Sequence, residues 1–290
     1  MVAIRHVLFP TDFSDSAEVA LERAIAIAAR YGAKLTMLHV IVPHAEEAAE
    51  ADAAFPDDDA VAALVPEGSD APAIERLTSR GYSAADKILS FAEANSVDLV
   101  VMGSHGRRGF SRALLGSEAE RVLRLATCPV LTVSSKMTHG LRRTPERVLV
   151  PIDFSATSDR ALEAGIALAK EFGAAIDVAH VFDEPVVPPF LMDHTGSYIS
   201  TDPKMKDRCV ASLDETLARH SIDGEVTKHV LEGRVAPTIA ELAEKVSADL
   251  IVVGTRGLSG LDFVLLGSTA SHLLRLSPCP VLTLHEGGKE

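Results

Sequence analysis

The sequence predicts an α/β protein made of two tandem doubly wound domains, each a parallel sheet with helices on both faces. Each half of the 290-residue chain alternates short apolar runs with longer amphipathic stretches, which is the pattern of parallel strands joined by crossover helices. The second half also repeats the first, because Val7 to Ser14 corresponds to Val148 to Ser155. From there the two copies stay in register, without a gap, as far as Val40 and Val181.

The repeating unit is roughly 140 residues long, which is the usual size of a single domain. We therefore expect a first domain over residues 1–138 and a second over 145–290, joined by the polar segment from Met137 to Pro145. An apolar content of 47% is enough for two ordinary hydrophobic cores.

The elements of the first half follow from periodicity and capping signals. Ser14 or Ser16 can cap a helix, and Gly32 can end it. Leu99 to Val101 is apolar throughout, as expected of a central strand buried on both sides. The predicted elements are, in order, a strand from His6 to Phe9, a helix ending at Tyr31, a strand from Lys34 to Val40, a helix from Glu46 to Leu64 that is kinked near Pro56, a strand from Ala73 to Thr78, a helix from Ser83 to Asn95, a strand from Asp98 to Met102, a helix from Ser117 to Ala126 and a strand from Val130 to Val133.

The second half is expected to follow the same order, since its sequence repeats the same signals. Its predicted strands are Arg147 to Val150, Ala175 to Val181, Glu225 to Leu231, Asp249 to Val253 and Val281 to Leu284. Its predicted helices are Ser158 to Phe172, Lys204 to His220, Pro237 to Ser247 and Ser268 to Leu276.

Composition narrows the possible functions. A formal net charge of -13 argues against a general nucleic-acid binder, which needs a concentration of Lys and Arg. No apolar run approaches the ~20 residues that a membrane span needs, and no signal-peptide pattern is present. Cys128 and Cys279 occupy equivalent positions of the repeat, so we expect them to lie in separate cores, unpaired. This cysteine usage predicts a reduced, cytoplasmic protein.

A glycine motif occurs once in each half. Gly103 and Gly106 are followed after nine residues by the pair Gly116–Ser117. The second copy has Gly254, Gly257 and then, at the same spacing, Gly267–Ser268. A glycine–serine pair that opens a helix can bind phosphate, because free N–H groups and the helix dipole point at the anion.

The predicted topology brings these motifs to one edge of each sheet. Ligands of doubly wound sheets bind beyond the carboxyl ends of the strands. Asp12 follows the first strand, Val40 ends the second and Gly103 ends the fourth, so the three should converge on one crevice. The same argument applies to Asp153, Val181 and Gly254 in the second half.

Simpler interpretations of the same residues exist. Asp12 and Asp153 could merely end strands and organise the helix that follows. The motif glycines could be loop residues or plain helix starters. His39 and His180 at the strand ends are more often packing or hydrogen-bonded histidines than ligands. Asp98 and Asp249 precede strands and are predicted to be turn residues.

The glycine motifs and the strand-end residues of both halves resemble those of the universal stress protein family. The likeness covers nearly the whole chain, as a fused tandem pair. The ATP-binding members of that family carry the same glycine spacing. The resemblance implies a five-stranded sheet of order 3-2-1-4-5 in each half. It also implies pairing through the fifth strand, either in a homodimer or between the two halves of one chain.

The resemblance further implies a ligand, which is ATP with or without Mg²⁺. By analogy the adenine edge would meet the backbone at Val40 and Val181, the aspartates would lie near the adenosine, and the glycines and serines would line the phosphates. The full candidate set is Pro10, Thr11, Asp12, Val40, Gly103, Gly106, Arg107, Gly116 and Ser117 in the first half, and Pro151, Asp153, Val181, Gly254, Gly257, Gly267 and Ser268 in the second.

The two predicted sites differ in detail. Thr11 is replaced by Ile152, so the second half loses a hydroxyl near the first strand. Glu118 follows Ser117 where the second half has Thr269, which places a carboxylate close to the expected phosphates. Arg107 and Arg108 could offset that charge.

Three functions remain open from the sequence. We prefer a nucleotide-binding stress protein that regulates a protein partner and hydrolyses ATP slowly or not at all, because no acid–base pair recurs in both halves and no phosphate loop with Lys-Ser/Thr is present. The alternatives are a nucleotide hydrolase and a dimeric scaffold that binds no nucleotide.

Overall fold

The computed structural model describes residues 4–42, 54–104, 115–134, 137, 144–183, 204–222, 224–255 and 266–285. The first half contains β1 (His6–Thr11), α1 (Asp15–Tyr31), β2 (Lys34–Ile41), α2 (Asp58–Leu64), β3 (Ile74–Arg80), α3 (Ala84–Ala94), β4 (Leu99–Gly103), α4 (Ser117–Leu125) and β5 (Val130–Val133). The second half contains β6 (Arg147–Pro151), α5 (Ala156–Phe172), β7 (Ala175–Asp183), α7 (Met205–Ala218), β8 (Val226–Gly233), α8 (Val235–Val246), β9 (Leu250–Gly254), α9 (Ser268–Leu276) and β10 (Val281–Leu284).

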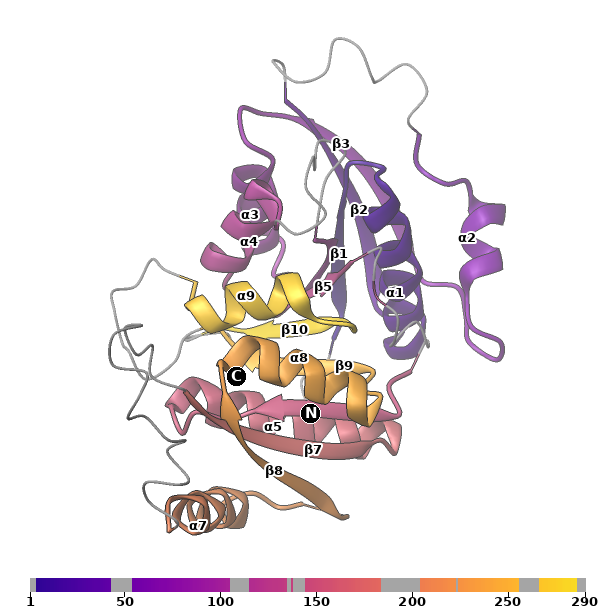
Figure 1. The fold of residues 1–290 in the computed structure, drawn as a ribbon. Helices are drawn as coiled ribbons and strands as arrows, with labels where there is room; N and C mark the ends of the chain where they lie inside the picture. The colour runs from indigo at the N-terminus through magenta and orange to yellow at the C-terminus, as the bar shows by residue number, and fades with distance from the viewer. Residues whose placement is uncertain are drawn as a thin grey trace.

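The ten strands of the described residues form a single sheet in the order β3-β2-β1-β4-β5-β10-β9-β6-β7-β8. Counted from its outer edge, each half has the strand order that the family resemblance implies, and pairs within a half are parallel. The halves meet where β5 pairs antiparallel with β10, with Leu131 opposite Leu282. The predicted fold class is therefore confirmed, and the fifth strands pair inside one chain (Figure 1).

Helices cover both faces of the sheet (Figure 1). Buried side chains of α3, α4, α8 and α9 pack on one face, and those of α1, α2, α5 and α7 pack on the other. Each face carries a continuous apolar cluster with members from both halves. Cys128 and Cys279 are unpaired as expected, but they belong to the same cluster. The prediction of separate cores was wrong, because the pairing of β5 with β10 merges them.

Local signals explain most helix boundaries. Gly32 and Gly173 end α1 and α5 in the left-handed conformation, at φ 60° and 66°. Within the described residues, the helix predicted from Glu46 begins only at Asp58, and residues 54–57 are not helical. The Asp57 side chain accepts a hydrogen bond from the Ala60 N–H and so caps α2. The helix therefore begins after Pro56 instead of bending there.

Two aspartates fasten the starts of neighbouring strands together. Asp98 Oδ2 accepts hydrogen bonds from the N–H groups of Arg5 and His6, at 2.8 and 3.0 Å. Asp249 Oδ2 accepts the equivalent pair from Glu146 and Arg147. The expectation of turn residues missed this function, since it depends on strands about a hundred residues apart.

Candidate functional site

The turn between β1 and α1 is tightly constrained, and its copy between β6 and α5 repeats the geometry. Phe13 and Phe154 adopt the left-handed conformation, with φ of 58° and 64°. Such a conformation is costly for a bulky residue and persists only where its surroundings enforce it. The preceding Asp12 accepts a hydrogen bond from the Ser14 N–H at 3.1 Å. Asp153 accepts hydrogen bonds from both the N–H and the hydroxyl of Ser155.

These contacts match the simpler interpretation of Asp12 and Asp153, in which the carboxylate organises the start of the next helix. Both side chains are only partly buried and lie at the carboxyl edge of the sheet. A role in ligand binding is compatible with that position, and it stays a prediction.

The histidines at the ends of β2 and β7 brace these turns. His39 Nδ1 donates to the Thr11 carbonyl at 2.8 Å, and His180 Nδ1 donates to the Ile152 carbonyl at 2.8 Å. Each imidazole also packs against the left-handed phenylalanine of its turn, at ring-centroid distances of 4.7 and 4.6 Å. The expectation that these are hydrogen-bonded packing histidines is confirmed. The repeated Asp-Phe-Ser triplet was the available signal for the strained turn, and sequence reasoning missed it.

The first motif glycines are fixed by helix packing. A Cβ atom on Gly103 would lie 2.6 Å from Ser16 Oγ and 3.0 Å from the Ser16 carbonyl carbon. On Gly254 it would lie 2.9 Å from Thr157 Cβ and 3.0 Å from the Thr157 backbone. Real Cβ atoms do not approach so closely. Glycine therefore lets α1 and α5 pack this closely on the strands, whether or not a ligand binds.

The later motif glycines begin helices next to these strand ends. Gly116 and Gly267 are the N-cap residues of α4 and α9, and they supply no side chain to cap the first turn. The Gly116 N–H donates to the Ser104 carbonyl at 3.0 Å, and the Gly267 N–H donates to the Thr255 carbonyl at 2.8 Å. The helix starts are thereby held beside the ends of β4 and β9.

The structure thus brings together, in each half, the strand-end turn, the first motif glycine and the helix that begins with the last motif glycine. Pro10 and Thr11, and likewise Pro151, belong to the last residues of β1 and β6. Val40 and Val181 lie near the ends of the adjacent β2 and β7. Gly106, Arg107 and Gly257 lie outside the described residues.

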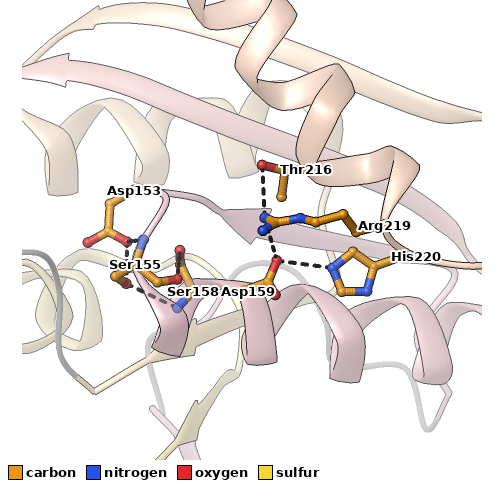
Figure 2. Close-up of polar contacts among 7 residues, drawn as sticks. All are labelled: Asp153, Ser155, Ser158, Asp159, Thr216, Arg219 and His220. Carbon is orange, nitrogen blue, oxygen red and sulfur yellow. Dashed lines mark hydrogen bonds and ion pairs between the residues drawn. The ribbon is translucent and has the colours of Figure 1, made fainter.

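The two sites differ at the start of the first helix. In the first half, Thr11 Oγ1 accepts a hydrogen bond from the Phe13 N–H at 3.0 Å. Ile152 offers no such acceptor. Instead, Ser155 Oγ accepts a hydrogen bond from the Ser158 N–H and donates to Asp153, as Figure 2 shows.

A second difference lies one helical turn further on (Figure 2). Asp159 of α5 accepts hydrogen bonds from Arg219 and His220, both at 3.1 Å, at the end of α7. These contacts fasten α7 beside the turn that contains Asp153. In the first half the covering helix α2 is joined to β3 by the Arg76–Asp58 ion pair at 2.7 Å, and an ion pair of Lys228 with Asp214 likewise joins β8 to α7.

Glu118 was expected to place its carboxylate near bound phosphates, which stays a prediction, and the structure shows what the carboxylate contacts within the protein. Its Oε2 accepts hydrogen bonds from the Ala85 N–H and the Ser83 hydroxyl, so the carboxylate caps the start of α3. Within the described ranges no group of three or more His, Cys, Asp or Glu side chains forms a potential metal site.

Fold and site together define a class: a tandem, doubly wound α/β protein with a glycine motif at the carboxyl edge of the sheet in each half. The sequence model of the universal stress protein family matches this chain twice, over residues 3–134 and 145–285. The chain therefore belongs to the universal stress protein family.

Individual relatives agree with this assignment. A universal stress protein of Methanocaldococcus jannaschii is 35% identical over 147 residues, which are 50% of this chain and 85% of that protein. One of Mycobacterium tuberculosis is 30% identical over 198 residues, and the match spans 67% of this chain and 63% of that relative.

Solved structures share the tandem fold. A universal stress protein of Archaeoglobus fulgidus superimposes with a TM-score of 0.66 at 24% identity, covering 97% of this chain and 98% of that one. A putative universal stress protein of Pseudomonas aeruginosa gives 0.64 at 22% identity, with coverage of 98% and 94%. Among the described residues, no helix is both long and apolar enough to cross a membrane.

Proposed function

We propose that this chain is an adenine-nucleotide-binding regulatory protein, with ATP held at the carboxyl edge of each half. The observation that carries the proposal is the repeated helix start at Gly116 and Gly267. In both halves a helix without a side-chain cap begins next to a strand end and beside an aspartate turn. N–H groups and a helix dipole at such a place favour a phosphate.

The residues present fit the nucleotide. Ser117 and Ser268 open the helices and offer hydroxyl and N–H donors to phosphate oxygens. Asp12 and Asp153 lie where a carboxylate could accept from ribose hydroxyls. If Mg²⁺ accompanies ATP, we expect phosphate oxygens and water to supply most of its ligands, as Mg²⁺ sites commonly do.

Binding, not turnover, is the proposed activity. We expect any hydrolysis to be slower than about 1 per second, the low end of typical enzymes. The nucleotide would bias the contacts of this chain with a protein partner or with a second copy. The three unpaired cysteines suit a reducing compartment, and we propose the cytoplasm.

The scaffold function has one observation in its favour. Packing alone explains the glycines at 103 and 254, so part of the motif would persist without any ligand. A decisive experiment must therefore change the helix starts at Gly116 and Gly267, where the negative φ admits a side chain.

The first test uses Gly116→Glu and Gly267→Glu, singly and together. Both positions have negative φ, at −63° and −55°, and an acidic side chain at a helix start is tolerated by the helix dipole. The added carboxylate should compete with phosphate for the same N–H groups. Since each lost hydrogen bond to a charged group is worth about 1.5–3 kcal/mol, we expect ATP affinity at the altered site to fall at least ~10-fold.

Calorimetric titration with ATP and mass spectrometry of nucleotides released from the purified protein provide the readout. We expect two nucleotides per wild-type chain, one in each single variant and none in the double variant. Gly116→Ala and Gly267→Ala are the matched controls, because they add a side chain without charge. Unchanged stoichiometry in the folded double glutamate variant would contradict the proposal, and an absence of binding in the wild type would favour the scaffold.

A further inference from the structure

A cleft lies between the two halves, on the face of the sheet that carries α1 and α5. Its volume is about 180 Å³. Leu131 of β5 and Leu282 of β10, which face each other in the antiparallel pair, both line it. We call it the seam cleft, and its helix-borne lining residues are Arg23, Ile27, Tyr31, Ala164, Ala167, Leu168, Glu171 and Phe172.

The lining residues of the seam cleft come largely in equivalent pairs, one from each half of the repeat. Pro129 of the first half has its counterpart in Pro280, and Leu99 has its counterpart in Leu250. The cleft therefore lies where the two halves meet, away from the carboxyl-edge crevices proposed to hold nucleotide. A molecule bound there would contact both halves at once.

The last turns of α1 and α5 meet at the seam cleft. The Arg30 guanidinium carbon lies 6.0 Å from the centre of the Phe172 ring. The equivalent contact, with the two halves exchanged, joins Tyr31 to Glu171. Burial, together with the hydrogen bond to Glu171, raises the pKa of Tyr31 well above its usual range. These two contacts join the halves on the helix side of the cleft, opposite the paired strands.

The charged groups that line the cleft already have partners within the protein. Asp98 and Asp249 each accept two backbone N–H groups. Glu171 is engaged by Tyr31. Arg23 has 8% of its surface exposed, and burial lowers its pKa, while the nearby carboxylates of Glu22 and of Asp249 in the other half favour its charge. A charged ligand would therefore lose its hydration in the cleft without meeting an unpaired charge of opposite sign, so its binding is disfavoured.

The size of the cleft indicates the size of its occupant. An apolar cavity of about 150 Å³ is known to accept a single aromatic ring, and the seam cleft is slightly larger. The volume thus suits a small molecule of one or two rings.

We propose that the seam cleft binds one small, neutral, apolar molecule per chain, in contact with both halves. The binding energy comes from burying the ligand against side chains such as Ile27, Leu168 and Leu282, which are now only partly buried. This site is independent of the proposed nucleotide sites.

The experiment titrates the full chain with 2-naphthol at neutral pH by calorimetry. Naphthalene-2-sulfonate, which adds a negative charge to the same rings, is titrated in parallel. We expect one saturable 2-naphthol site per chain and binding of the sulfonate at least about tenfold weaker. No saturable 2-naphthol binding, or equal affinity for the sulfonate, would overturn the proposal.

Ala164→Phe fills the cleft from α5, and Ala94→Phe makes the same change on an exposed position of α3, which packs on the opposite face. The first should weaken 2-naphthol binding at least about tenfold and the second less than about twofold. If Ala164→Phe does not fold, Ile27→Lys serves instead, because a long side chain can bring its charge to the rim. Wild-type affinity in the folded cleft variant would count against the site, as would displacement of 2-naphthol by saturating ATP.

Discussion

At the scale of single residues, the candidate sites are built from positions that also hold the fold together. Gly103 and Gly254 admit the first turns of α1 and α5, and Asp12 and Asp153 organise the turns before those helices. A variant at such a position changes stability and binding together. Its effect on stability must therefore be measured before any change in binding is interpreted.

Gly103→Ala tests the packing requirement directly. The new methyl group would lie 2.6 Å from Ser16 Oγ and 3.0 Å from backbone, so α1 must move away from β4. We expect a loss of about 1–3 kcal/mol in the free energy of unfolding, as for other overpacked sites. Urea denaturation measures it, with Gly116→Ala as the control that should cost much less. Equal losses in the two variants would show that contact with α1 does not dictate Gly103.

The buried thiols predict a dependence of stability on alkaline pH. Burial raises the pKa of Cys128 to about 11 and that of Cys279 to about 12, whereas an unfolded thiol titrates near ~8.5. Above that pH the unfolded state loses thiol protons that the folded state keeps, so stability is constant below about pH 8.5 and falls as pH rises towards 11–12. Urea midpoints from pH 7 to 10.5 should decline less in Cys128→Ala/Cys279→Ala than in the wild type. Identical slopes would rule out this cause.

At the scale of elements, contacts between segments far apart in sequence decide how the helices and strands are fastened. The buried Asp177 of β7 is held by Arg147 of β6 at 2.7 Å and by His229 of β8 at 2.6 Å. The first half has Thr36 at the equivalent position, hydrogen-bonded to His6 and Glu75. The same backbone arrangement is thus stabilised by different side chains in the two copies.

Glu118→Ala tests the link between α4 and α3. Without the carboxylate, the Ala85 N–H and the Ser83 hydroxyl lose a shared acceptor, and we expect a cost of about 0.5–2 kcal/mol, as for loss of a helix cap. Chemical denaturation measures it. Glu93→Ala, at an exposed position of α3, should change stability by less than about 0.5 kcal/mol. A neutral Glu118→Ala variant would mean that water replaces the cap without loss.

At the scale of the whole molecule, the two repeats form one structural unit. The β5–β10 pair makes the sheet continuous, and both apolar clusters include residues from the two halves. Leu8 of β1 and Ile251 of β9 belong to the same cluster. We therefore expect the halves to unfold together, although each has the size of an independent domain.

Ile251→Ala tests this cooperativity. Ile251 is fully buried, and its truncation should destabilise the chain by about 2–5 kcal/mol. If the halves unfold as one unit, hydrogen exchange by mass spectrometry will show faster exchange in β1 and β4 of the first half as well as in β9. Leu125→Ala, at a partly exposed position, serves as the control. Faster exchange confined to the second half would establish two independent units.

The sequence by itself determined the tandem repeat, the alternation of strands and helices, and the placement of the glycine motifs at strand ends. These follow from local periodicity and from the rule that parallel strands share a carboxyl edge. Sequence also identified His39 and His180 as packing residues, since strand-end histidines commonly bond to backbone. It misjudged the start of α2 and missed the cap that Glu118 gives α3, because caps depend on which neighbour lies within reach.

Only the tertiary structure decided how the halves combine. The antiparallel pairing of β5 with β10 merges the cores that contain Cys128 and Cys279 and opens the seam cleft under α1 and α5. A local pattern fixes which face of an element is apolar, but it does not fix which distant surface covers that face. That choice depends on the shape and charge of surfaces that exist only once the chain has folded.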